Sequence, residues 1–389
     1  MPSAFYETAL FRASPNYKLV AVDRLAEQER RSLEAADDGD DLYGALVPQG
    51  GTGALRAASC DTALLFLALA EPGALPRFAL RRLGAETHTV ITRLLLDGVL
   101  QISLDGQFRG GAQVAGLSAP PPHGGPADLG VAALRYGQEL CGLSDTELGR
   151  RLYFYGRKPL SPRLQARLGD GYACARFLGT HDDGAPARLL RRRYAQVPPP
   201  PGGAPHWWQW LSTTEPPCNS DRRAGYKLYL SPQIDDTPAA LSILIGVLPQ
   251  ARGVTGFKVG VGLEGLCRPD KIVVYFTELD DLFRFAGRLR RLLAGCAAHG
   301  VPFSAAASDD ALLSWGADPP RGAIDGARAT SWRMWVACRL AEYLVAARAA
   351  PAPAREPWQY ALERLALAGI DTGTWIPANG MWPTALELA

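Results

Sequence analysis

The sequence predicts an α+β protein with a mixed sheet and packed helices in its C-terminal half and a smaller module at its N-terminus. Residues 225–306 alternate between apolar strand-like segments and amphipathic helical ones. Residues 61–112 contain three helical segments followed by a hairpin signal. Pro/Gly-rich stretches at 113–131 and 198–203 separate these parts. We therefore expect an N-terminal module over 1–115, a helical linker region over 116–203 and an α+β domain with C-terminal helices over 204–389.

Length, charge and cysteine usage narrow the class of protein. The 389 residues leave room for two domains. With 41 basic and 39 acidic residues the net charge is +2, which disfavours a bulk nucleic-acid binder. The sequence contains no apolar run of about 18 residues, so we expect no membrane span. Its N-terminus has no charged region followed by an apolar stretch, so we expect no secretion signal, and its 7 cysteines form no CxxC pair. We expect a cytoplasmic protein without a metal site.

The N-terminal module is expected to begin with irregular structure over residues 1–57, which are polar and rich in glycine near their end. Helices are then expected from Asp61 to Pro72, over 75–84 and over 85–98. The segment VLQISLDGQFRGG alternates apolar and polar residues around Asp105-Gly106, which predicts a hairpin. Three helices followed by a two-stranded ribbon are the outline of a winged helix.

A winged-helix-like module is compatible with three roles: binding DNA, binding a leader peptide, or supporting the structure. Its third helix offers only Arg93, His88 and several threonines to a DNA groove, which is a poor reading surface. Such modules in peptide-modifying enzymes instead receive a leader peptide as an added strand. A purely structural role is the third.

The remaining segments predict helices and strands in the following order. Helices are expected at ADLGVAALRYGQEL, SDTELGRRLYFYG and ARLLRRRYAQV. A β-α-β-β-α-β order follows, with strands at GYKLYLS, VTGFKVGV, CRPDKIVVYF and VPFSAA and helices at TPAALSILIGVLPQ and LDDLFRFAGRLRRLLAGCAAHG, before two final helices. The basic, aromatic stretches RLYFYGRKPLSP and ARLLRRRY fit either an acidic leader peptide or solvated helix faces.

Two lysines lie within strands that otherwise look buried. Lysine is depleted in strands and usually lies at their edges. Lys227 shares a strand face with Tyr229, and Lys258 shares one with Gly256 and Gly260, whose lack of side chains leaves space above the sheet. A lysine in such surroundings has a lowered pKa and can act as a base. Ordinary edge-strand lysines remain the alternative.

The strand motifs resemble a known family. GYKLYLS, FKVG and then RPDKIVVYF are similar to the phosphoserine/phosphothreonine lyase domain of class III and IV lanthipeptide synthetases. That family is related to effector phosphothreonine lyases and, more loosely, to the effector-like lyases of class V lanthipeptide and thioamitide gene clusters. The likeness spans about 220–340 and implies a phosphothreonine-lyase-like fold.

By that resemblance, Lys258 is the general base that removes the α-proton. Lys227 binds the substrate phosphate, and Arg268, Lys271 and Arg223 complete the anion clamp, since charge-assisted bonds to phosphate are strong. The phosphate would leave as Lys258 takes the proton.

The proton donor departs from the family pattern, which has a histidine where this chain has Tyr229. A phenol with a pKa near ~10 is a weaker acid than an imidazolium. Tyr229 is therefore either the catalytic acid or a packed aromatic. His206, just before the first strand, is another candidate donor.

The resemblance implies β-elimination of phosphate from phosphoserine or phosphothreonine in a ribosomally synthesised precursor peptide, forming dehydroamino acids in lanthipeptide-type biosynthesis. The family needs no cofactor for this step. The chain has no GxxxxGKS loop and no kinase motifs, so a separate kinase is an expected partner, together with a cyclase. The alternative is a non-catalytic subunit that binds leader or phosphopeptide in a modifying complex. Transcriptional regulation is disfavoured by the near-neutral charge.

Overall fold

The computed structural model divides into two compact units. Unit 1 comprises residues 1–120 and 342–368, and unit 2 comprises 121–341 and 369–389. The structure describes Tyr6, residues 8–34, 41–50, 54–116, 127–180, 185–191, 193–198, 207–214, 225–319, 331–350 and 356–378, and Met381.

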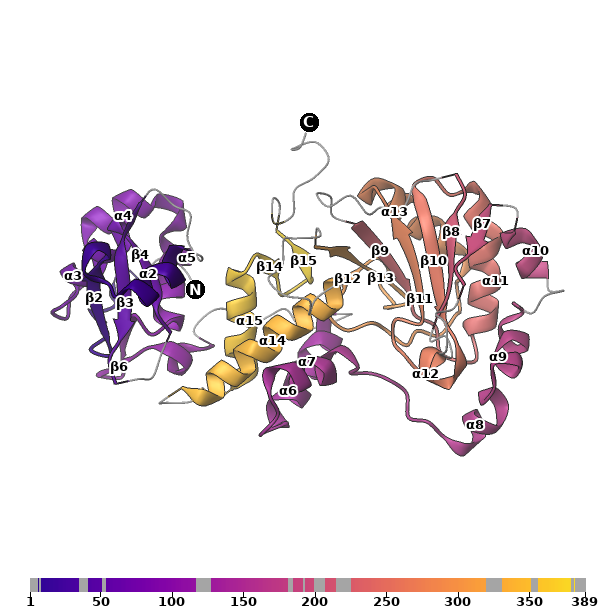
Figure 1. Ribbon diagram of the computed structural model, residues 1–389, viewed down its shortest axis with the longest axis horizontal. Coiled ribbons are helices and arrows are strands. Elements are labelled where there is room, and N and C mark those ends of the chain that lie inside the picture. The colour runs from indigo at the N-terminus through magenta and orange to yellow at the C-terminus, as the bar shows by residue number, and fades with distance from the viewer. Residues whose placement is uncertain are drawn as a thin grey trace. The chain divides into compact units, whose positions relative to one another are not determined.

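Unit 2 is built around a seven-stranded sheet in which every pairing is antiparallel. Figure 1 shows these strands as one sheet. Along the central strands Leu228, Phe257 and Val274 lie in one apolar core on one face, and the opposite face carries polar residues together with a small apolar cluster. In spatial order the strands are β12 (Ala305–Ala306), β13 (Leu313–Asp318), β9 (Gly225–Leu230), β11 (Ile272–Phe276), β10 (Val254–Gly260), β8 (Trp207–Ser212) and β7 (Tyr194–Gln196).

Helices cover the apolar face of this sheet. Leu228, Phe257 and Val274 are fully buried and belong to one core with residues of α11 (Thr237–Val247) and α13 (Leu279–Leu292). Burying each such side chain contributes about 1.5–3 kcal/mol. This confirms the predicted α+β class with helices packed on a sheet. The short helices α8 (Pro162–Leu168), α9 (Gly171–Leu178), α10 (Ala185–Leu190) and α12 (Gly262–Leu266) also belong to unit 2.

Different elements pack on the opposite face. Tyr229 and Val273 cluster there with Val301. Gly316 of β13 lies against the ring of Trp332, which begins α14 (Trp332–Ala349). The same unit contains α6 (Ala127–Glu139), α7 (Asp145–Tyr153) and the pair β14 (Ile370–Asp371) and β15 (Ile376–Pro377).

Unit 1 contains the predicted three helices and ribbon. The helices are α3 (Cys60–Ala68), α4 (Arg77–Leu83) and α5 (Thr87–Leu96). The ribbon strands β5 (Leu100–Leu104) and β6 (Gln107–Arg109) are joined at Asp105 and Gly106, which both have positive φ. These elements are confirmed, and the winged-helix assignment stays a prediction.

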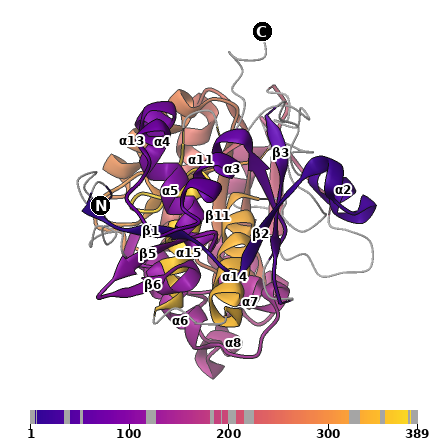
Figure 2. The same ribbon diagram turned by 90° about the vertical axis from the view of Figure 1, so that its left-hand side faces the viewer.

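The expected irregularity of residues 1–57 is wrong. These residues form a three-stranded sheet in the order β2-β3-β4, a helix, and a strand that pairs with β5 (Figure 2). The alternation of apolar and polar residues is weak in these strands, because small residues such as Gly44, Ala45 and Ala58 occupy buried positions. The strands are formed by pairing between segments that are distant in the sequence, which a local pattern does not reveal. The elements are β1 (Phe11–Ala13), β2 (Tyr17–Ala21), α2 (Glu27–Glu34), β3 (Leu42–Pro48) and β4 (Arg56–Ser59).

The basic helix predicted at ARLLRRRYAQV is shorter than expected. Helix α10 ends at Leu190, and the chain then enters edge strand β7. The parts of the Pro/Gly-rich boundaries at 117–126 and 199–206 lie outside the described residues. The last helix, α15 (Pro357–Leu367), lies where predicted and packs within unit 1, with Tyr360 in the same core as Leu95.

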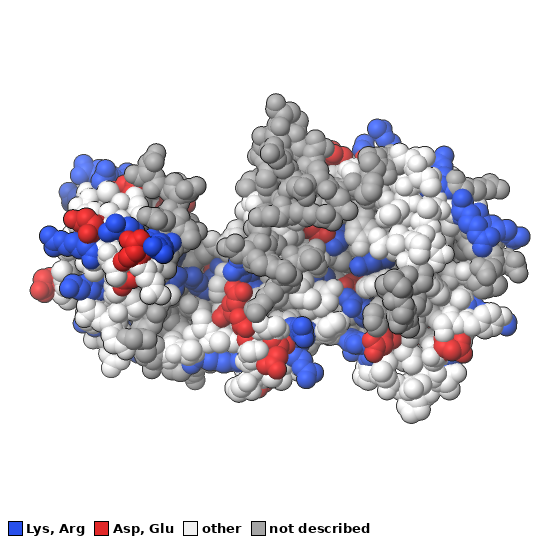
Figure 3. Space-filling model, viewed as in Figure 1, with Lys and Arg blue, Asp and Glu red and all other residues white. Residues whose placement is uncertain are grey.

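Surface charge agrees with the near-neutral composition. The visible face of unit 1 carries acidic and basic side chains side by side rather than a single basic patch (Figure 3). Among the described helices, none is both long enough and apolar enough to cross a membrane.

Candidate anion-binding site

The polar face of the large sheet brings Lys227 and Lys258 to the same side. Lys227 of β9 pairs with Tyr275 of β11, and Val273 of β11 pairs with Lys258 of β10. Paired residues on antiparallel neighbours point to the same face, so both lysines share the face of Tyr275. The two lysines, far apart in the sequence, therefore lie on one surface.

Three cations lie beside two aromatic rings on this surface. The Nζ atoms of Lys227 and Lys258 are 5.4 and 5.9 Å from the centroid of Tyr275. The ring of Trp207 has Lys258 Nζ at 4.1 Å and Arg268 Cζ at 4.9 Å from its centroid. Each ring face partly compensates the positive charges that approach it. The arrangement concentrates positive charge in one place.

Lys258 is the cation without an acidic partner. Within the described residues its ammonium group makes no hydrogen bond or ion pair, and its contacts are the two rings. Burial, and next the nearby charge of Lys227, lower the pKa of Lys258 to about 8. About a tenth of the side chain is then neutral near pH 7, in the form that accepts a proton.

Lys227 has a carboxylate partner that the sequence did not suggest. Its side chain is almost buried and forms an ion pair with Asp318, at the end of β13. The other oxygen of Asp318 accepts a hydrogen bond from the backbone N–H of Trp332 at 2.9 Å. The pair compensates a charge whose uncompensated burial would be costly.

Arg268 is held in place by two residues. Its Nε and Nη2 each donate to Asp270 at 2.9 Å, and Nη2 also donates to the hydroxyl of Tyr153 at 2.8 Å. Its Nη1 has no hydrogen-bond partner in the part of the chain that the structure describes. Arg268 is therefore rigidly oriented and still has donors for an anion.

Asp270 is the buried anchor of this arrangement. Besides Arg268 it pairs with Nη1 of Arg333 at 2.8 Å, and Arg333 donates to the carbonyls of Pro302 and Tyr153. Although burial works in the opposite direction, the charges of Arg333 and Arg268 hold the pKa of Asp270 far below its ordinary value. The network fixes β11, α7 and α14 around the cations.

Tyr229 lies on the same face but is inaccessible. It is 3% exposed and packs with Val273 and Val301. Burial raises its pKa well above the ordinary value, so it keeps its proton and is a weak acid. Packing is the role that the geometry shows for this residue.

Lys271 is not brought together with the other cations. It is fully buried, donates to the carbonyl of Pro232 at 2.7 Å and lies 2.8 Å from Nδ1 of His299. Burial lowers its pKa to about 7, and burial also lowers that of His299 to about 4. Nε2 of His299 is 2.6 Å from the carbonyl oxygen of Gly156, so a neutral ring that donates there leaves Nδ1 to accept from Lys271. Arg223 and His206 lie outside the described residues.

Sequence reasoning missed most of the supporting residues. Only Asp270 had a visible signal, since it follows Arg268 in the RPDK motif and a carboxylate beside a buried arginine is its natural partner. Tyr275 lies in the same RPDKIVVYF motif but gave no such signal, and the others come from segments far away in the sequence: Tyr153, Trp207, Asp318 and Arg333.

No family model and no curated protein matches the chain. Among solved structures it is similar to an effector protein of Pseudomonas syringae pv. syringae strain 61, with TM-score 0.42, 11% identity, and 65% of this chain and 99% of that one covered. It is also similar to the type III effector/phosphothreonine lyase OspF from Shigella flexneri, with TM-score 0.27 and 14% identity. That match covers 33% of this chain and 75% of OspF. The match to the VirA phosphothreonine lyase effector of Chromobacterium violaceum has TM-score 0.26 and 14% identity. It covers 49% of this chain and 84% of VirA. Likenesses this distant assign neither a family nor an activity.

Proposed function

We propose that the protein is a lyase that eliminates phosphate from a phosphoserine or phosphothreonine residue of a peptide. The observation that carries the proposal is Lys258, a partly buried lysine that makes no ion pair with described residues and whose pKa is lowered to about 8. It lies beside two further cations, Lys227 and Arg268, that suit a doubly negative group.

The chemistry follows from these roles. Lys227 and Nη1 of Arg268 bind the phosphate oxygens and neutralise their charge. Neutral Lys258 removes the α-proton, the electrons of the Cα–H bond form the Cα=Cβ bond, and the Cβ–O bond breaks to release phosphate. The product is dehydroalanine or dehydrobutyrine. The step exchanges no electrons with a cofactor.

The negative charge that develops on the departing phosphate opposes cleavage of the Cβ–O bond. Expulsion from a phosphate dianion creates a trianion unless a proton or cations compensate it. Because the buried Tyr229 is a weak acid, we assign that compensation mainly to Lys227 and Arg268. Because Tyr229 is buried in the protein, we assign its hydroxyl no contact with the leaving oxygen.

The proposed substrate is a ribosomally synthesised precursor peptide of the lanthipeptide type. Support comes from the sequence resemblance of the three strand motifs. Because the chain has no nucleotide-binding motif, a separate kinase would install the phosphate and a cyclase would use the product. We place the protein in the cytoplasm, where such partners would act.

Incubation with synthetic phosphothreonine and phosphoserine peptides tests the activity. Mass spectrometry should show loss of one phosphoric acid and, after a thiol is added, an adduct at the new double bond. Plain hydrolysis would instead restore threonine or serine and give no adduct. Lys258→Ala should abolish the reaction and leave the circular dichroism spectrum unchanged. Elimination that survives in this variant would remove Lys258 from the mechanism.

A second candidate function is a non-catalytic subunit that binds phosphopeptide or leader peptide. It is favoured by the raised pKa of Tyr229, which stands at the family's histidine position. Wild-type protein that binds the phosphopeptide and leaves its mass unchanged, with or without the partner enzymes, would support this function against the lyase.

A further inference from the structure

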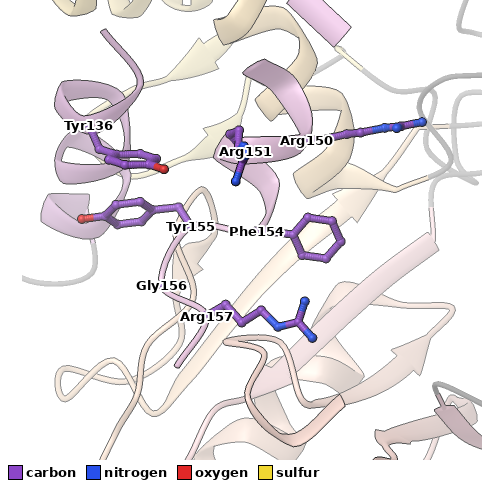
Figure 4. Close-up of a pocket in the computed structure, with 7 residues that line it drawn as sticks. All are labelled: Tyr136, Arg150, Arg151, Phe154, Tyr155, Gly156 and Arg157. Carbon is purple, nitrogen blue, oxygen red and sulfur yellow. The ribbon is translucent and has the colours of Figure 1, made fainter. Parts of the chain in front are cut away.

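A concave surface lies in unit 2, at the end of α7. It is a hollow of about 500 Å³. Figure 4 shows Tyr136 and Tyr155 with their rings on one side, Phe154 and Arg157 on the other, and Arg151 between them. We call this surface the arginine hollow, defined by its lining residues Tyr136, Arg150, Arg151, Phe154, Tyr155, Gly156 and Arg157.

The hollow carries positive charge that the described protein only partly neutralises. Arg150 and Arg151 are exposed and make no hydrogen bond or ion pair through their side chains with described residues, although both attract Glu147. Arg157 pairs with Glu264 at 3.6 Å. Arg151 and Arg157 bring two guanidinium groups to one concave surface, and the side chain of Arg150 extends away from them at its rim (Figure 4). Guanidinium groups favour carboxylates, which they bind through two parallel hydrogen bonds.

Exposed aromatic rings add an apolar side to the hollow. Tyr136 is 40% and Phe154 39% exposed. The rings of Tyr136 and Tyr155 lie 5.4 Å apart between their centroids. Such rings contact peptide backbone and aliphatic stems while arginines take the charged ends.

The arginine hollow adjoins the candidate anion-binding site through Phe154. The ring centroid of Phe154 is 5.9 Å from Cζ of Arg157 in the hollow and 5.2 Å from Cζ of Arg268 in the site. A chain whose phosphorylated side chain lies at Arg268 therefore reaches the hollow within a few residues, at about 3.3–3.6 Å per extended residue.

We propose that the arginine hollow binds acidic residues of the peptide substrate that flank the phosphorylated residue. This inference rests on the proposed function, because the proximity to Arg268 selects a peptide rather than another polyanion. The substrate class is then an acidic peptide with phosphoserine or phosphothreonine next to aspartate or glutamate. The hollow adds affinity and sequence preference and takes no part in the bond-breaking step.

Charge reversal tests the inference without any need for catalysis. The probe is a fluorescein-labelled, unphosphorylated peptide of alternating aspartate and glutamate, with a serine/glycine peptide of equal length for comparison. Fluorescence anisotropy should show wild-type binding of the acidic peptide only, weakened by salt. Arg150→Glu/Arg151→Glu should weaken this binding about 10-fold or more, since exposed ion pairs contribute modestly one by one.

The matched control is Arg163→Glu/Arg291→Glu, which makes the same charge change at two exposed helix arginines outside the hollow. It should leave binding within about 2-fold of wild type. Because glutamate near the C-terminus of α7 opposes the helix dipole, Arg150→Gln/Arg151→Gln serves as a second variant that avoids this effect.

Two outcomes would overturn the inference whether or not the protein eliminates phosphate. One is equal binding of the acidic peptide by wild type and both hollow variants, and the other is no binding by folded wild type. If elimination occurs, acidic-flank phosphopeptides should show an about 10-fold higher KM in the hollow variants with kcat unchanged, and neutral-flank peptides should show no change. Absence of elimination alone would count against the proposed function and not against the hollow.

Discussion

At the residue scale, the reactivity assigned to Lys258 comes from its surroundings. A lysine beside a carboxylate stays protonated, and Lys227 has such a partner in Asp318. Lys258 instead lies between the rings of Trp207 and Tyr275, which attract the charged form only weakly. Burial therefore prevails and lowers its pKa.

The pH dependence of elimination follows from this pKa. The neutral amine is the base, so kcat/KM should rise as pH increases through about 8 and then level off. Below that value the slope should approach about tenfold per pH unit. The rate of dehydrobutyrine formation from a phosphothreonine peptide, measured over a series of pH values, tests this dependence. A profile that is flat across this interval would exclude Lys258 as the titrating base.

Asp270 should be essential for stability. Asp270→Asn removes the negative charge between Arg268 and Arg333 and leaves buried cations uncompensated. We expect the free energy of unfolding to fall by about 3–5 kcal/mol in urea denaturation. Asp235→Asn, which breaks the exposed pair with Arg167, is the control and should cost less than about 1 kcal/mol.

The contribution of Asp270 also has a pH signature. Its pKa is depressed in the folded state, so its stabilisation is complete above the unfolded value near ~3.9 and is lost as the pH falls below it. The difference in unfolding free energy between wild type and Asp270→Asn should therefore shrink in acid. A difference that stays constant or grows there would contradict the assigned ion pairs.

At the element scale, the position of α14 depends on a strand residue without a side chain. A Cβ atom at Gly316 of β13 would lie 2.4 Å from Cδ1 of Trp332, the first residue of α14. Gly316→Ala should destabilise the protein by about 1–3 kcal/mol and disturb the neighbouring Arg333. Thermal and urea unfolding measure the loss.

Gly287 of α13 provides the opposite control. A Cβ atom there meets nothing within 4 Å, and the residue is helical. Gly287→Ala should stabilise the protein by about 0.5–1 kcal/mol, because alanine loses less entropy in a helix. Equal free energies of unfolding for Gly316→Ala and Gly287→Ala would contradict the packing of Trp332 against β13.

Amphipathic elements were the predictable part of the fold. Helix α13 and the strands around Lys227 and Lys258 have clear periodicity and lie where expected. Strand β13 was missed, because LSWGAD carries little alternation and acquires its strand form from pairing with β9. Since Asp318 ends that strand, the partner of Lys227 was missed with it.

At the scale of the whole molecule, unit 1 is discontinuous in the sequence. Ala347 and Tyr360 belong to the same core as residues from Tyr6 to Val114. Sequence patterns predicted the two C-terminal helices but could not show that they complete the N-terminal unit, because helix periodicity identifies an apolar face and not its partner.

Removal of residues 1–116 should therefore expose apolar surface on the segment Glu342–Ala368. We expect the remaining chain to aggregate or bind a hydrophobic dye. Size-exclusion chromatography and dye fluorescence, with the full chain as reference, measure this. A monodisperse fragment that binds no dye would show that those helices need no N-terminal partner.

The central claim is that the cations around Lys258 form a site for a phosphorylated side chain. Isothermal titration of Lys258→Arg, which keeps the charge but cannot act as a base, with a phosphothreonine peptide and its unphosphorylated form tests it most directly. We predict about 100-fold tighter binding of the phosphorylated peptide, reduced by Lys227→Met in the same background. Equal affinities for the two peptides would contradict the claim.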